Sequence, residues 1–159
     1  MNPDFSEVRQ HHIKVLKGRG ATSNLQGRFE AEARERTYDG WDAELGHISD
    51  EYQRKTEVSD EFAKSILSRN SSPDIPFNVS LNPYRGCEHG CIYCFARPSR
   101  SYLGLSPGLD FESRIFAKVN AAELLRQELA RPGYVPENIA IGVNTDAYQP
   151  CERDKRLTR

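Results

Sequence analysis

Three cysteines stand within eight residues of one another, at Cys87, Cys91 and Cys94, in the spacing C-x3-C-x2-C. Gly90, between the first two, predicts a tight loop in which the three thiolates converge on one inorganic centre. Three thiolates can hold a 4Fe–4S cube and leave one iron for a ligand that is not protein. The spacing therefore favours an iron–sulfur cluster on these cysteines.

Two other interpretations use the same residues. Sulfur ligands also suit zinc, and His89 or Cys151 would then complete a tetrahedron. However, His89 lies two residues from both Cys87 and Cys91, which is tighter than the usual spacings of zinc fingers. A reactive-thiol redox loop would need only the x2 pair Cys91 and Cys94, so that Cys87 would have no role.

The segments around the cysteines predict an α/β fold. Residues 77–81 alternate apolar and polar side chains, which indicates a strand that ends just before the cysteine loop. A helix follows from Asn120, the expected N-cap with Glu123 as its capping-box partner. Residues 139–143 alternate again and predict a second strand. Strand, helix and strand in this order imply a parallel pair joined by a crossover.

The first half of the chain has few apolar residues. Only 14 of the 34 Leu, Ile, Val and Phe residues lie in 1–75, whereas 20 lie in 76–159. We therefore expect a polar, largely irregular and partly disordered extension over 1–75 and a small core over 76–159. A short helix is predicted near 59–69, where Phe62 and Ile66 would share one face.

Charge names no partner. The 159 residues carry 22 basic and 23 acidic side chains, a net charge of −1, so neither half is the basic body of a nucleic-acid module. The basic glycine-rich run at 17–20 could contact phosphates, but a solvated loop is the favoured interpretation. No apolar run is long enough to cross a membrane and no signal peptide is evident, so we expect a cytoplasmic protein without membrane contact. In that reducing compartment, cysteines suggest metal binding before disulfides.

Wider motifs carry a family resemblance. An aromatic residue, Tyr93, precedes the third cysteine, and the surrounding string is NPYRGCEHGCIYCFARP at 82–98. Two further strings are LGLSPGLDF at 103–111 and NTDAYQP at 144–150. Together they resemble the radical S-adenosylmethionine (SAM) superfamily. The closer resemblance is to bacterial members labelled DNA repair photolyase-like, which are related to spore photoproduct lyase.

The resemblance implies a partial (β/α)6 barrel, of which 76–159 would hold the first strand, helix and strand. A full (β/α)8 barrel takes about 250 residues, so even a six-unit version exceeds this length. We therefore expect a truncated radical SAM core that is inactive on its own.

The resemblance also implies an activity. Cys87, Cys91 and Cys94 would ligate a 4Fe–4S cluster whose fourth iron binds SAM, and one electron would cleave SAM to a 5′-deoxyadenosyl radical that abstracts hydrogen from a substrate. A reductant such as flavodoxin or ferredoxin would supply the electron. The radical would serve a lyase-like reaction in DNA repair. No catalytic residue is identified. The alternative is a non-catalytic iron–sulfur or zinc-binding module.

The same resemblance suggests SAM contacts. Tyr93 would pack beside the adenine. Asn144, Thr145 and Asp146 stand where the superfamily often carries a Gly-Gly-Glu-like segment that holds the SAM amino group; Asp146 would contact the ammonium or else cap a turn. Lyase relatives place a hydrogen-donor cysteine where this chain has Asn144. Cys151 lies farther on, so we expect an ordinary loop thiol, a departure that weakens the case for thymine-dimer repair.

Overall fold

The computed structural model describes residues 18–21 and 55–159. The predictions for the rest of 1–75 lie outside these residues. The elements follow the order β1 (Glu57–Glu61), β2 (Leu67–Arg69), β3 (Val79–Leu81), β4 (Tyr84–Arg85), the 3-10 helix η2 (Arg97–Leu103), α1 (Leu109–Ser113), β5 (Arg114–Lys118), α2 (Ala121–Leu129), β6 (Ile139–Ile141) and α3 (Glu152–Lys155).

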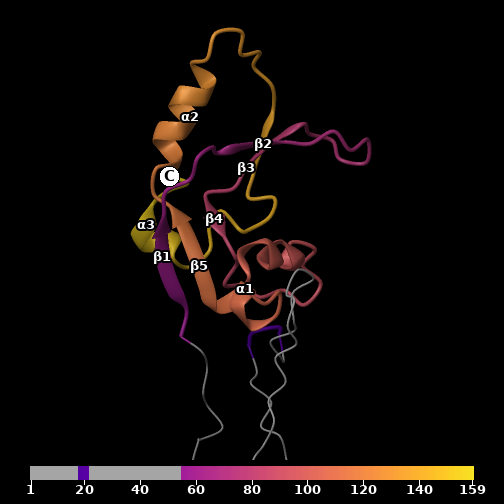
Figure 1. The fold of residues 1–159 in the computed structure, drawn as a ribbon, viewed down its shortest axis with the longest axis vertical. Helices are drawn as coiled ribbons and strands as arrows, with labels where there is room; N and C mark the ends of the chain where they lie inside the picture. The colour runs from indigo at the N-terminus through magenta and orange to yellow at the C-terminus, as the bar shows by residue number, and fades with distance from the viewer. Residues whose placement is uncertain (1–17, 22–54) are drawn as a thin grey trace, which may run out of the picture.

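The described strands form two three-stranded sheets rather than a closed barrel (Figure 1). One sheet has the order β1-β5-β4, and the other has the order β2-β3-β6. β3 and β4 are nearly continuous along the chain and are separated by Asn82 and Pro83. Because a proline cannot donate to a strand ladder, the chain leaves one sheet at this point and enters the other. The cysteine loop begins just after this crossing, where β4 ends.

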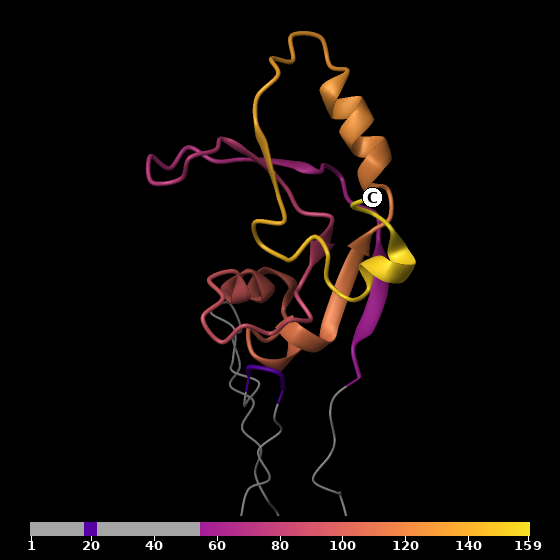
Figure 2. The same cartoon turned by 180° about the vertical axis from the view of Figure 1, so that it is seen from behind.

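The predicted parallel pair is confirmed. β3 pairs in parallel with β6, with Val79 opposite Ile139 and Leu81 opposite Ile141, and α2 lies between them in sequence. Leu124 of α2 packs against a small core that includes Leu81. Figures 1 and 2 both show α2 extending beyond the sheets, at the opposite end from the segment 18–21.

The capping prediction for α2 is wrong. Asn120 occupies the N-cap position, but its side chain makes no capping bond. Instead its Nδ2 donates to the Ala63 carbonyl oxygen and its Oδ1 accepts from the Ala63 N–H, both at 2.9 Å. The side chain therefore satisfies the backbone that follows β1, which a reading of local sequence could not anticipate.

The helix predicted near 59–69 is also wrong. β1 pairs in parallel with β5 along all five of its residues, and Val58 packs against the buried cluster around Ile115. Phe62, expected on the buried face of a helix, is 80% exposed. The ladder with β5 supplies the backbone hydrogen bonds that a short helix would otherwise make, so pairing overrides the local signal.

The helix α3 ends in a tight turn at Arg156. Arg156 adopts a left-handed conformation, with φ of 50°, and ends this helix. The buried Glu152 carboxylate then accepts the N–H groups of Leu157 and Thr158 at 3.0 and 2.9 Å. In the described part of the chain, no helix has the length and apolar character needed to span a membrane.

Candidate metal centre

The cysteine loop follows β4 and turns twice. The Gly90 N–H donates to the Cys87 carbonyl, and the Cys94 N–H donates to the Cys91 carbonyl. Gly90 has φ of 63°, a conformation that favours glycine. Cys87 is buried, Cys94 is half-buried and Cys91 is exposed, and all three are free thiols. Two consecutive turns therefore shape the short loop that carries the three free thiols.

The three cysteines line one cavity of about 490 Å³. Its other wall is the last residue of β6, Ile141, and the loop that follows it, residues 142–148, with Thr158 beside them. This volume is in the range of small-molecule sites. Free thiols on one loop are a suitable donor set for an iron–sulfur cluster or for zinc. Across residues 18–21 and 55–159, however, no three His, Cys, Asp or Glu side chains are already close enough together to hold a metal ion.

The structure brings three of the four predicted SAM-contact residues to this cavity. Asn144, Thr145 and Asp146 line it, whereas Tyr93 does not, and the Tyr93 side chain is 86% exposed. Asp146 Oδ2 lies 3.3 Å from His89 Nε2, so an ion pair spans the two walls when the histidine is protonated.

Thr145, besides lining the cavity, links its two walls. It is buried, and its hydroxyl donates to the Gly86 carbonyl at 2.8 Å. The buried Gln149 continues this contact between the two loops. Its Oε1 accepts the Glu88 N–H at 3.0 Å, and its Nε2 donates to Thr145 Oγ1 at 3.1 Å. Sequence reasoning overlooked Gln149, although it lies inside the NTDAYQP string that carries the resemblance.

Cys151 stands apart from the cavity. It is the N-cap residue of α3 and packs in the buried cluster with Tyr84, Ile115 and Ala117. Burial, reinforced by the nearby Glu88 charge, raises the pKa of its thiol to about 11. A protonated core thiol is a poor ligand and a poor nucleophile.

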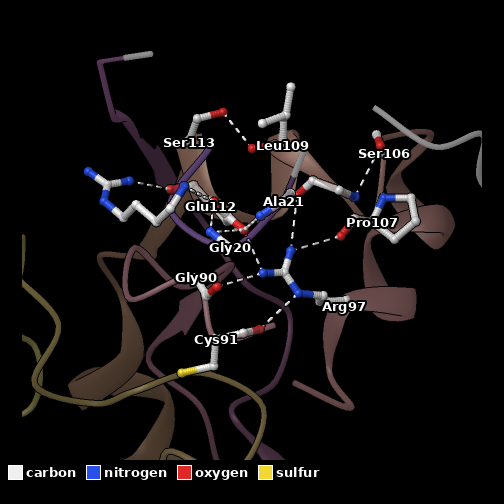
Figure 3. A network of polar contacts seen from close by, with 12 residues as sticks. Gly20, Ala21, Gly90, Cys91, Arg97, Ser106, Pro107, Leu109, Glu112 and Ser113 are labelled. Carbon is white, nitrogen blue, oxygen red and sulfur yellow. Dashed lines mark hydrogen bonds and ion pairs between the residues drawn. The ribbon is translucent and has the colours of Figure 1, made fainter. Parts of the chain in front are cut away.

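Sequence reasoning also missed the residues behind the cysteine loop. The basic run at 17–20 is predicted to be a solvated loop, but its described part, with Ala21, lies beside α1 in both ribbon views. The Ala21 N–H donates to Glu112 Oε1 at 2.7 Å. Figure 3 shows Arg97 between that carboxylate and the carbonyls of Gly90 and Cys91. The sequence Gly-Arg-Gly at 18–20 is the only local sign of a turn. Nothing in the neighbouring sequence indicates that the Glu112 carboxylate accepts the N–H groups of this turn.

The chain has relatives but matches no known protein family and no solved structure. Uncharacterized proteins of Mycobacterium bovis and Mycobacterium tuberculosis are each 50% identical to it over 90 residues. That stretch covers 56% of this chain and 26% of theirs. An uncharacterized protein of Methanocaldococcus jannaschii is 27% identical over 105 residues, which are 66% of this chain and 37% of the relative. The chain thus spans about a quarter of the mycobacterial relatives.

Proposed function

We propose that this chain is the cluster-bearing part of a radical SAM enzyme, with a 4Fe–4S cluster on Cys87, Cys91 and Cys94 and SAM on the remaining iron. The observation that carries the proposal is the single cavity that all three free thiols line, opposite the loop after β6. With both groups bound, the chemistry supplied is the reductive cleavage of SAM, which starts hydrogen abstraction from a substrate.

In this proposal, the chain's own residues bind the cluster and orient and shield SAM. The cysteines would hold the cluster, and Asp146 would present a carboxylate to the SAM ammonium from the facing wall. Asn144 is exposed in the same wall and offers an amide to the rest of SAM. Thr145 and Gln149 tie this wall to the loop that holds the thiols. The two binding walls are therefore held together by the protein itself.

The parallel β3 and β6 pair, with α2 between, supports a place at the start of a partial (β/α)6 barrel. The short coverage of the mycobacterial relatives fits a longer whole protein. The substrate follows from the resemblance alone, which suggests lyase-like DNA repair. A flavodoxin- or ferredoxin-type reductant in the cytoplasm would supply the electron, and no residue of this chain is assigned as catalytic.

A structural zinc or iron–sulfur module is the second candidate. His89 lines the same cavity and pairs with Asp146, and zinc-binding histidines usually have a carboxylate partner of this kind. In that case His89 would be the fourth ligand and no position would be open to SAM.

Anaerobic reconstitution decides between them. We expect about four irons and four sulfides per chain, and an electron paramagnetic signal of the reduced cluster that changes when SAM is added. Stoichiometric zinc without iron or sulfide would overturn the radical SAM proposal. A cluster whose signal ignores SAM would favour the non-catalytic iron–sulfur module.

A further inference from the structure

Glu112 is a buried carboxylate that holds a distant piece of backbone. Its side chain, near the end of α1, is 2% exposed. It accepts three consecutive backbone N–H groups, from Arg19 at 2.6 Å, Gly20 at 3.1 Å and Ala21 at 2.7 Å. Successive N–H groups of a turn form an anion-binding concavity. Here the anion is a side chain of the protein, so residues 18–21 are docked by charge-assisted hydrogen bonds.

Arg97 transmits this contact to the cysteine loop. One of its terminal nitrogens, Nη2, forms an ion pair with Glu112 and also donates to the Gly90 carbonyl at 2.8 Å. Its Nε donates to the Cys91 carbonyl at 3.1 Å. Because the guanidinium is planar and rigid, these bonds fix two successive peptide groups relative to Glu112. Figure 3 shows this arrangement.

The turn at 18–21 also touches the cysteine loop directly. A Cβ at Gly20 would overlap the Gly90 carbonyl oxygen, so this contact requires glycine. The Arg19 side chain reaches Glu88 Oε1 at 2.7 Å and Thr56 Oγ1 at 3.0 Å. The loop is therefore held at residues 88, 90 and 91 by side chains and a turn that do not line the cavity.

We propose that Glu112 and Arg97 are positioning residues for metal binding and that residues 18–21 complete a clamp that presets the backbone of the cysteine loop. A loop fixed before the ligand arrives loses less conformational entropy on binding, and supporting contacts usually strengthen metal sites. This inference rests on the proposed function only in that the three cysteines bind a metal. The kind of metal does not matter to it.

The test compares two matched variants of the full chain. Glu112→Gln leaves one acceptor oxygen where several N–H donors converge. Glu128→Gln makes the same change in α2, where that carboxylate accepts the N–H groups of Ile66 and Leu67 and does not touch the cysteine loop. Cobalt(II) is titrated anaerobically, and the thiolate-to-cobalt absorption gives affinity and coordination geometry; thermal melting reports folding.

We expect Glu112→Gln to weaken cobalt binding about 10- to 100-fold and to change the cobalt spectrum. Glu128→Gln should stay within about twofold of the parent affinity, because it is remote from the site. Equal affinities and spectra for parent and Glu112→Gln, at a temperature where both are folded, would overturn the clamp. A parent chain that binds neither cobalt nor iron would overturn the proposed function instead.

Two milder variants serve if Glu112→Gln does not fold. Arg97→Lys keeps the charge beside Glu112 but loses the fork that reaches Gly90 and Cys91. Gly20→Ala pushes the turn off the Gly90 carbonyl. Each should weaken cobalt binding and alter its spectrum, and parent-like values in both would refute the clamp.

Discussion

The two sides of the cysteine loop are built on opposite principles. The side that faces the cavity carries the thiols, with Cys91 exposed and Cys94 half-buried. The opposite side carries the half-buried Arg97 and the buried Glu112, whose bonds run mainly to backbone atoms. The comparison teaches that two of the three thiols are left accessible, whereas Cys87 is buried, and that the backbone carrying them is fixed by residues outside the cavity.

A second, neutral set of contacts joins the loop to the wall facing it. Thr145 and Gln149 bond Gly86 and Glu88 through hydroxyl and amide groups. Hydrogen bonds to charged groups are worth roughly twice those between neutral groups. We therefore expect the charged clamp to govern the shape of the loop and the neutral contacts to govern the spacing of the two walls.

The largest effect should come from the thiols themselves. Replacing Cys87, Cys91 or Cys94 by Ala removes one of three ligands, and we expect anaerobically reconstituted protein to lose nearly all its iron and sulfide. Iron analysis and absorbance near the sulfide charge-transfer bands check this. Cys151→Ala is the matched control and should retain the parent iron content, because that thiol lies in the core. Loss of one iron in the control would mean ligation by four cysteines.

The next largest effect should come from breaking the contact between the two walls of the cavity. Gln149→Ala leaves the Glu88 N–H without its buried acceptor and should lower the free energy of unfolding by about 1–3 kcal/mol. Gln127→Ala is the control, because Gln127 makes an exposed bond to Glu123 within α2. That change should cost at most about 0.5 kcal/mol. Denaturant titration measures both, and equal losses would show that the wall contact contributes little.

The local sequence pattern was enough to predict β3, α2 and β6. It also singled out the three cysteines that line the cavity. Alternating apolar residues and a thiol spacing are properties of a few neighbouring positions. β1 was missed because its sequence, EVSDE, is mostly polar and becomes a strand only by pairing with β5. The clamp was missed because Arg19 and Glu112 are 93 residues apart. A charged residue shows its partner only after folding has brought the two together.

The core thiol offers a pH test of the contrast between Cys151 and the loop cysteines. Burial raises its pKa from 9.0 to about 11, so above pH 9 the unfolded chain releases a proton that the folded chain keeps. The unfolded state then binds fewer protons, and stability falls between pH 9 and 11.

Cys151→Ala should therefore lose less stability than the parent over this interval, measured by denaturant titration at each pH. Burial also raises the pKa of Tyr84, so the loss that remains in the variant should begin nearer pH 10. Identical pH profiles for the variant and the parent would show that the Cys151 thiol titrates normally in the folded chain.

The smallest expected effect concerns His89, and it separates the two proposed functions. Its contact with Asp146 spans the cavity at 3.3 Å, but both side chains are nearly half exposed, so the pair should contribute about 1 kcal/mol or less to stability. If three thiolates hold a cluster, His89→Ala keeps its iron, its sulfide and the response of its signal to SAM. If His89 is instead the fourth zinc ligand, the variant binds zinc markedly more weakly, because a tetrahedral site has lost one of its donors.

Asp146→Asn refines the result: it removes the carboxylate proposed to meet the SAM ammonium while leaving all three thiols in place. Weaker SAM binding at unchanged iron content would then identify the wall after β6 as the SAM side of the cavity.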